Sequence, residues 1–458
     1  MSIARLQVNE FTPRIEPTGA ADGALTYAPA VYLPTQEGTI LHGRQVTNRL
    51  TRRGLIRASA AGVAASAAGA GVAAGNHWLP PDPRRPPGHY GTPGEGTDEG
   101  DVPQPRELPR EPGPTIKTVH DRGDAIITRF QGDLDATDFG AWGDPRTGLI
   151  YISQRLTDHI MVFDRKEERY VEKHWIPTQG AGAHAIKVDV ENNSVWFAAG
   201  EASRIGRLVL DPVTLRPRNF VEYSTPGDIR TERKPHGLVV VGDAVWYTDD
   251  RGDRVGFLDV NTGLVHQIEE HVEADGINVE KRWVRVRDRR GRRRRKRILR
   301  IWVGGGQNIT IIDGVTKRIT HRLVIPEEPG FAQLRVHDIH YEPRSNRVFV
   351  LLRGSDHVVW FDADRPKKGA QGWITPGRPA AGLDHIDLGQ NYMWWTEGLS
   401  NNLTRYDLRT GDVKPYLVPN PIGYFNPHGI FVAPKWKEVW FTEREALCRL
   451  TFKDGRAP

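Results

Sequence analysis

The chain has 458 residues, of which 38% are hydrophobic and 26% are charged. This length suits two or three domains or one large repeat fold, and the apolar fraction is enough for a core, which excludes wholesale disorder. No stretch of about 20 strongly apolar residues occurs, which excludes a polytopic membrane protein. The single cysteine, Cys448, excludes a framework of intramolecular disulfides and a thiolate zinc cluster.

The formal net charge of +6 comes from one segment. Residues 281–297 hold twelve Lys/Arg and one Asp, a net of +11, so the rest of the chain carries −5. A dedicated nucleic-acid binder more often spreads its positive charge over a whole face. The charge distribution therefore argues against nucleic acid as a partner.

Residues 1–75 are predicted to be an N-terminal extension that contains an export signal. Arg52 and Arg53 precede a short apolar stretch, and a weakly apolar Ala/Gly run follows at 58–75. A paired arginine before small and apolar residues is typical of the twin-arginine export route. We therefore expect export to the periplasm, the cell envelope or the extracellular space. A buried Ala-rich helix is the alternative interpretation.

Residues 76–115 are predicted to be a Pro/Gly-rich disordered linker. Eleven prolines lie between Pro80 and Pro114, with scattered charge around them. Such a composition cannot pack a core. We expect an extended connection between the export signal and the folded domain.

From about residue 130 the sequence repeats seven times, at intervals of about 47 residues. The clearest units begin Pro235-His236-Gly237-Leu238 and Pro427-His428-Gly429-Ile430. Each unit holds short β-rich runs separated by turn residues, without helical periodicity. Four short strands at this period predict an all-β fold, a seven-bladed β-propeller over residues 116–458. The run 125–130 is expected to complete the last blade and close the ring.

Tryptophan recurs at one position of the repeat. Trp196, Trp246, Trp394 and Trp440 all lie in the second β-rich run of their units. Large aromatic side chains at a repeated strand position are expected to pack between blades.

Histidine opens the first, channel-lining run in five units, as His184, His236, His337, His385 and His428. Residues equidistant from a hairpin turn face each other, which pairs His236 with Asp249, His385 with Glu397 and His428 with Glu443. Three blades should therefore each place a histidine and a carboxylate at one end of the channel.

A ring of imidazoles and carboxylates can bind a divalent cation and supply a general base. Histidine with carboxylate suits zinc, manganese or iron, and carboxylate with water suits magnesium. The alternative is that these polar side chains only link neighbouring blades by hydrogen bonds.

The repeat His-Gly-Ile/Leu, then Val-Trp-Phe-Thr-Glu, then Arg-Ile/Val-Gly resembles the streptogramin B lyases (virginiamycin B lyase) over residues 130–455. The resemblance implies a seven-bladed propeller that opens cyclic depsipeptides by magnesium-dependent elimination across the ester. It also implies that His428 is the catalytic histidine and that Glu443, fifteen residues later, binds Mg²⁺.

The same resemblance extends to the neighbouring blade. It implies that His385 contacts the substrate, and His184, His236 and His337 are further candidates for substrate binding. Asn426 stands where the family has a second magnesium-binding Glu, which implies weaker Mg²⁺ binding, and Glu397 could compensate.

Three functions follow from these observations. The first is an exported, metal-dependent carbon–oxygen lyase that acts on a cyclic depsipeptide or related ester, with Mg²⁺ or another divalent cation. The second is a metal-dependent hydrolase of the gluconolactonase type, a family that is normally six-bladed. The third is a non-catalytic propeller that binds a ligand at the cell envelope. In each, a small molecule or peptide occupies the channel mouth of a monomer.

Residues 281–300 are predicted to form a basic hairpin that protrudes from the fourth unit. Apolar and basic residues alternate at 283–287 and at 297–302, on either side of an arginine cluster. The segment 281–297 could bind an anionic surface of the cell envelope. No aromatic residue interrupts the arginine cluster, so stacking on nucleic-acid bases is not supported. A solvated loop is the alternative.

Overall fold

The structure is a computed structural model that describes residues 112–134, 140–226, 234–250, 254–268, 274–287, 290–326, 334–378, 381–419 and 427–458. The predicted export signal, most of the predicted linker and Asn426 lie outside these ranges. Within the described part, the helical content is one 3-10 turn, η1 (Pro366–Lys368), and no helix there is long and apolar enough to cross a membrane.

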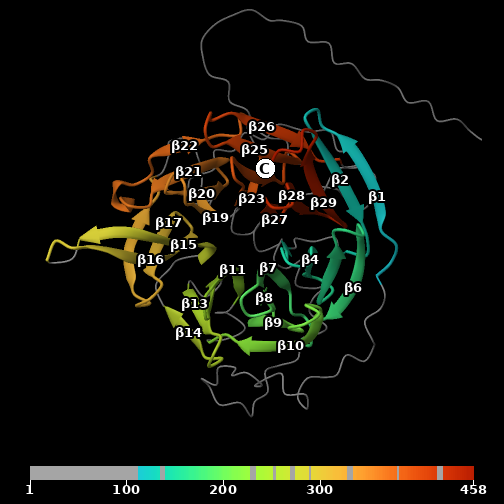
Figure 1. Cartoon of the computed structure of the whole chain (residues 1–458), viewed down its shortest axis with the longest axis horizontal. Coiled ribbons are helices and arrows are strands. Elements are labelled where there is room, and N and C mark those ends of the chain that lie inside the picture. Colours follow the sequence, from blue (N-terminus) through green and yellow to red (C-terminus); the bar gives the residue numbers. More distant parts are fainter. Residues whose placement is uncertain are drawn as a thin grey trace, which may run out of the picture. The chain divides into compact units, whose positions relative to one another are not determined.

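The strands form seven antiparallel sheets arranged around a common centre, which confirms the seven-bladed β-propeller (Figure 1). Blade 1 consists of β3 (Ala141–Gly143), β4 (Leu149–Gln154), β5 (His159–Asp164) and β6 (Arg169–Trp175). Blade 2 consists of β7 (Ala183–Asp189), β8 (Ser194–Ala199), β9 (Arg204–Leu210) and β10 (Pro217–Ser224). Blade 3 consists of β11 (Pro235–Val241), β12 (Ala244–Asp249), β13 (Arg254–Asp259) and β14 (Val265–Ile268).

The remaining blades follow the same order from the centre outward. Blade 4 consists of β15 (Ala274–Arg287), β16 (Arg293–Gly305), β17 (Asn308–Asp313) and β18 (Ile319–Val324). Blade 5 consists of β19 (Arg335–Glu342), β20 (Arg347–Arg353), β21 (His357–Asp362) and β22 (Gly372–Ile374). Blade 6 consists of β23 (Leu383–Leu388), β24 (Tyr392–Glu397), β25 (Asn402–Asp407) and β26 (Val413–Leu417). Blade 7 contains β27 (Ile430–Ala433), β28 (Glu438–Glu443) and β29 (Ala446–Phe452).

The two ends of the described chain close the ring inside blade 7. Strand β2 (Ala125–Gln131) pairs antiparallel with β29, from Ala125 opposite Phe452 to Gln131 opposite Ala446. This pairing confirms the predicted role of residues 125–130. Strand β1 (Ile116–Asp121) adds a fifth, outermost strand to the blade. Because strands from both ends of the described chain share one sheet, their pairing closes the ring.

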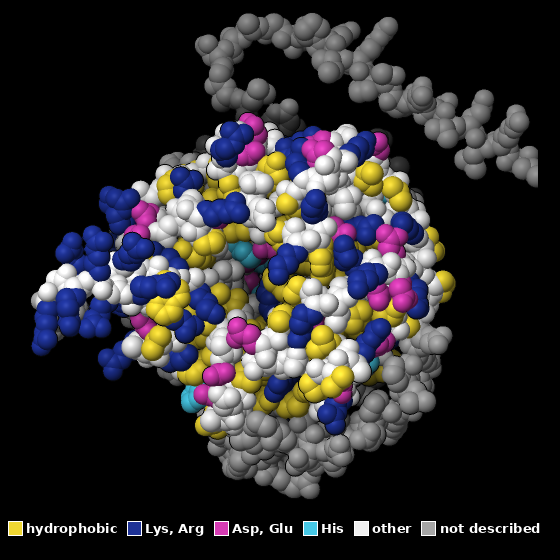
Figure 2. All heavy atoms as spheres, in the orientation of Figure 1, with side chains coloured by type: hydrophobic (Ala, Val, Ile, Leu, Met, Phe, Trp, Pro, Cys, Tyr) yellow, Lys and Arg dark blue, Asp and Glu magenta, His cyan; other side chains and the backbone are white. Residues whose placement is uncertain are grey.

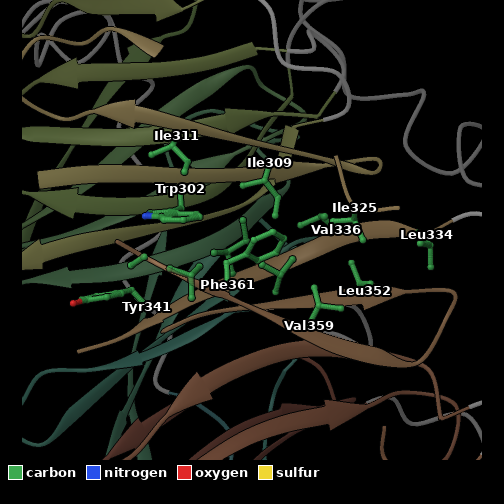
Figure 3. Packing of buried hydrophobic residues seen from close by; sticks show 14 residues of the cluster. Trp302, Ile309, Ile311, Ile325, Leu334, Val336, Tyr341, Leu352, Val359 and Phe361 are labelled. Carbon is green, nitrogen blue, oxygen red and sulfur yellow. The ribbon is translucent and has the colours of Figure 1, made fainter. Parts of the chain in front are cut away.

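The core is divided among the contacts between neighbouring blades. Trp196, Trp246, Trp394 and Trp440 are fully buried, each in a cluster that draws on two adjacent blades, which confirms the predicted packing. Figure 3 shows the cluster between blades 4 and 5, where Trp302 lies among aliphatic side chains of both sheets. The indole N–H groups of Trp302 and Trp440 donate to Glu280 and Glu438, at 3.0 and 2.9 Å. Among the described residues, the buried indole N–H groups of Trp246 and Trp394 have no hydrogen-bond partner, so the packing of the ring rather than a hydrogen bond explains why tryptophan recurs there.

Strands β15 and β16 continue beyond blade 4 as a two-stranded ribbon. The pairing extends without interruption from Ile277 opposite Val303 to Arg287 opposite Arg293. The ribbon projects from the ring, and Lys and Arg side chains cover it (Figures 1 and 2).

Candidate functional site

A hollow lined by both polar and apolar side chains lies at the centre of the ring, where the innermost strands of the blades meet. About 690 Å³ of its space is not filled by protein atoms, part of it open to solvent. All five predicted ring histidines line it: His184, His236, His337, His385 and His428. Figure 2 shows histidine side chains within this hollow. The structure thus brings together the predicted catalytic histidine and the predicted substrate-binding histidines.

An irregularity in the inner strands of blades 2 to 7 sets which residue faces the hollow. In β11 the pairing with β12 skips from Pro235 to Leu238, and in β23 the pairing with β24 skips from Leu383 to Ile386. An extra residue of this kind bends the strand and re-aims its side chains. The residue two positions before Leu238, Ile386 or the matching apolar residue is therefore the equivalent ring position in blades 2 to 7.

At this ring position stand His184, His236, Asp275, His337, Asp384 and His428, in blades 2 to 7. Two of these are aspartates that the sequence reasoning missed. Asp275-Gly276-Ile277 occupies the place of His-Gly-Ile, a substitution visible in the sequence. The prediction that His385 shares the ring position is wrong, because Asp384 holds it and His385 follows by one residue.

The same irregularity overturns the predicted face-to-face pairs of histidine and carboxylate. Glu397 pairs with Leu383 and Asp249 pairs with Pro235, each one residue short of the expected partner. Glu397 accepts hydrogen bonds from Trp395 and Thr404 of its own blade and from Arg378, which precedes β23. Because the extra residue displaces only the inner strand, the carboxylates of the second strand stay with the blade interior.

Glu443 likewise has its partner inside blade 7. Its carboxylate forms a buried salt bridge with Arg129 of β2, and burial raises the pKa of Glu443 although Arg129 opposes the shift. Glu443 and Glu397 therefore each face an arginine rather than a common point. Asn426 lies outside the described residues, so the Mg²⁺ site that the family resemblance implies stays a prediction, and the two carboxylates that it would use are each engaged by an arginine.

Hydroxyl groups of one blade hold the ring residues of the next. Thr248 donates to the carbonyl oxygen of Asp275 at 2.8 Å, and Thr396 donates to that of His428 at 2.8 Å. Thr396 also accepts a hydrogen bond from the backbone N–H of His385. Each buried hydroxyl thus connects the irregular backbone of two neighbouring inner strands and orients the side chains in the hollow.

Replacement of Thr396 by valine is expected to lower the free energy of unfolding by about 1–3 kcal/mol, because the carbonyl of His428 and the amide of His385 lose a buried partner. Urea unfolding followed by tryptophan fluorescence measures the change. Thr320→Val is the control, since Thr320 also donates to a carbonyl but is exposed. Equal effects of the two changes would show that the buried hydroxyl has no special role.

The two ring aspartates each lie between two histidines. Asp275 is 2.8 Å from His236 Nδ1 and 2.9 Å from His337 Nδ1. Asp384 is 3.0 Å from His337 Nε2 and 3.4 Å from His428 Nε2. The ring of His385 is centred 4.5 Å from that of His428. The hollow therefore holds a chain of alternating imidazole and carboxylate groups.

The neighbouring carboxylates and imidazoles shift the pKa values of the histidines in opposite directions. Burial opposes ionisation of Asp275 and Asp384, but the imidazoles outweigh it and hold the pKa of both carboxyls well below the usual value. Burial also opposes the charge on His337, yet Asp275 and Asp384 raise its pKa to about 10. Burial and the nearby imidazoles hold the pKa of His184 well below its usual value. At neutral pH the hollow thus holds both a charged imidazole, His337, and a neutral one, His184.

The fold and the hollow define the described chain as a seven-bladed β-propeller with acid–base side chains at its centre. Among solved structures, one described as a streptogramin B lyase structure aligns with a TM-score of 0.57 at 18% identity, covering 72% of this chain and 98% of that chain. One described as the structure of U3-55K aligns with a TM-score of 0.52 at 10% identity, covering 71% and 98%. No protein-family model and no curated protein sequence matches the chain. At these identities the likeness confirms the fold alone.

Proposed function

We propose that the chain is a carbon–oxygen lyase that opens a cyclic depsipeptide or related ester in the central hollow. The observation that carries the proposal is the convergence of His385 and His428 on a hollow in which Asp384 lies beside His428. The likeness in fold to a streptogramin B lyase structure agrees with this choice.

The proposed reaction is an elimination in which His428 acts as the base. His428 takes the proton from the carbon next to a carbonyl, and the electron pair of that C–H bond forms a carbon–carbon double bond. The bond from the neighbouring carbon to the ester oxygen breaks, and the ester leaves as a carboxylate. Asp384, 3.4 Å from His428 Nε2, stabilises the imidazolium that forms, as a carboxylate does beside a catalytic histidine.

Product mass tests the proposal. The purified full-length chain is incubated with a cyclic depsipeptide, and the products are separated and weighed. Elimination gives an opened, unsaturated product of unchanged mass, whereas hydrolysis adds one water. The unchanged mass is the expected result. A product heavier by one water would instead favour the hydrolase alternative, and binding without conversion would favour the non-catalytic alternative.

The structure bears unequally on the two alternatives. A hydrolase of the gluconolactonase type agrees poorly with seven blades. A non-catalytic propeller at the cell envelope is favoured by the salt bridge between Glu443 and Arg129, which engages the carboxylate that the family would use for a metal. From the sequence, we also propose that the chain is exported by the twin-arginine route and that it is a monomer.

We also propose that the ribbon of β15 and β16 binds an anionic surface of the cell envelope. Arg285 lies directly opposite Arg295, and Arg287 lies opposite Arg293. Like charges opposite each other destabilise an antiparallel pair, so an external polyanion would relieve a cost that the fold carries. Trp283, at the base of the ribbon, is 61% exposed and lies 5.2 Å from the Arg295 guanidinium, as suits an interface between water and lipid.

Replacement of Arg292–Arg295 by serine is expected to reduce binding to vesicles that contain phosphatidylglycerol by about 100-fold or more, at roughly 1 kcal/mol for each residue near the surface. Co-sedimentation at low and high salt measures the change, and wild-type binding should itself weaken with salt. The control replaces four exposed basic residues of other blades by serine: Lys166, Arg218, Arg409 and Lys435. Equal losses of vesicle binding in both variants would show that net charge alone causes the effect. Retained binding in the Arg292–Arg295 variant would exclude the ribbon as the binding surface.

A further inference from the structure

Two neighbouring blades bring a second kind of site to the hollow. His337 from β19 of blade 5 and the adjacent Asp384 and His385 from β23 of blade 6 each offer one ligand atom, and these three atoms lie within 4.8 Å of one another. The imidazole rings of His337 and His385 are centred 5.0 Å apart. Among the described residues, this is the group of three metal-binding side chains whose ligand atoms converge.

The atoms at the centre of this group lie side by side rather than in a hydrogen bond. Nε2 of His337 is 3.0 Å from a carboxylate oxygen of Asp384, yet the two are not aligned as donor and acceptor. His337 and Asp384 are both more than nine-tenths buried, where a polar atom without a well-aligned partner is costly. Such a pair of close but unaligned polar atoms is expected where both atoms are directed at a common third point, as two ligands of one ion would be.

A second layer of charged groups orients all three side chains. Asp275 is 2.9 Å from Nδ1 of His337, and Asp338 is 3.2 Å from Nδ1 of His385. Metal-binding histidines commonly give their other ring N–H to a carboxylate, which orients the imidazole and makes its free nitrogen a better ligand. Arg353 lies 2.8 Å from the carboxylate of Asp384 and orients that side chain in the same way. Nε2 of each histidine is thereby left for a ligand in the hollow.

We propose that His337, Asp384 and His385 bind a divalent transition-metal ion of the Zn²⁺ type, with open coordination positions toward the hollow. Two imidazoles and one carboxylate suit Zn²⁺, Mn²⁺ or Fe²⁺, whereas Mg²⁺ and Ca²⁺ require mostly oxygen ligands. The ion would take the place of a proton between Nε2 of His337 and Asp384. The half-buried His385 lies on the open side, where a bound molecule could complete the coordination. The proposal rests on side-chain geometry and not on the lyase reaction.

Zinc titration of the full-length chain tests the site. After treatment with a chelator, the protein is titrated with Zn²⁺ in competition with a coloured chelator, and one equivalent is expected to bind. Asp384→Asn and His385→Gln should each weaken binding by at least about 100-fold, and Asp275→Asn, which removes only an orienting group, by about 10–100-fold. The control is His340→Gln, because His340 also lines the hollow but pairs with Asp387, outside the group. It should bind within about twofold of wild type, since His340 acts on Asp338 through its charge alone and its own ion-pair partner is Asp387.

A spectroscopic measurement separates this site from nonspecific binding by histidines. Co²⁺ bound in place of Zn²⁺ should give the intense absorption of a four- or five-coordinate ion, and Asp384→Asn should abolish it. Circular dichroism and urea unfolding establish that each variant is folded. Absence of stoichiometric Zn²⁺ binding, or equal loss in His340→Gln and Asp384→Asn, overturns the proposal. Zinc binding without any ester elimination would overturn the proposed function alone and leave the metal site intact.

Discussion

Replacement of His428 by alanine is expected to lower the rate of ester elimination by about 10²–10⁴-fold, the contribution typical of a positioned general base. The variant loses the imidazole that would accept the proton, while Asp384 remains in place. Initial rates of product formation, followed by mass, measure the loss. The fold should survive, because the bond from Thr396 reaches the backbone carbonyl of His428 rather than its ring.

The control for this prediction is His321→Ala. His321 lies on β18, on the outer part of blade 4, and does not line the hollow. Its removal deletes an equal imidazole without reaching the proposed site, so the rate should stay at the wild-type value. A His428→Ala variant that retained the wild-type rate would remove the base from the proposed mechanism, and any elimination would then have to proceed through another residue.

The blade count, the ring closure and the buried tryptophans could all be predicted from the sequence, because each depends on a period. A repeat of about 47 residues with turn signals specifies four short strands, and a strand left over at one end must pair with the other end. Trp394 and Trp440 recur at one strand position because the same contact recurs between blades. Patterns that repeat are visible without coordinates.

The composition of the site could be predicted only in part, because it depends on one extra residue in the inner strands of blades 2 to 7. Counting outward from a turn assumes an uninterrupted ladder, and that assumption paired His385 with Glu397 and gave the ring position to His385. Regular pairing of β23 with β24 resumes at the apolar residue Ile386. Alignment of the repeats on this residue would have assigned the ring position to Asp384. No sequence spacing could show that Arg129 meets Glu443, since the two lie 314 residues apart.

This last contact gives Glu443 a role that the family resemblance does not imply. Arg129 belongs to the strand that closes the ring, and Glu443 belongs to the same blade at the other end of the chain. Both side chains are buried, and Arg129 also donates to Gln131 at 2.9 Å. The salt bridge therefore links the two ends of the chain across β29.

Replacement of Arg129 by methionine is expected to cost about 3–5 kcal/mol in the free energy of unfolding, because Glu443 is left buried without its cationic partner. The cost should be larger at pH 8 than at pH 5. Burial raises the pKa of Glu443 and Arg129 opposes this shift, so the loss of Arg129 raises the pKa further. The folded variant then holds the proton more tightly than folded wild type does, and its stability falls more than that of wild type as pH rises. Urea unfolding at the two pH values measures both effects.

The double replacement of Arg129 and Glu443 by methionine separates a structural role for Glu443 from a role in metal binding. If the pair closes the ring, the double variant should recover most of the stability lost in Arg129→Met, since neither charge is then buried alone. Lys117→Met is the control, because it breaks an exposed pair with Glu168 and should cost no more than about 1 kcal/mol. An Arg129→Met variant as stable as wild type would contradict the closure role. It would also leave the Glu443 carboxylate available as the Mg²⁺ ligand that the resemblance to streptogramin B lyases implies.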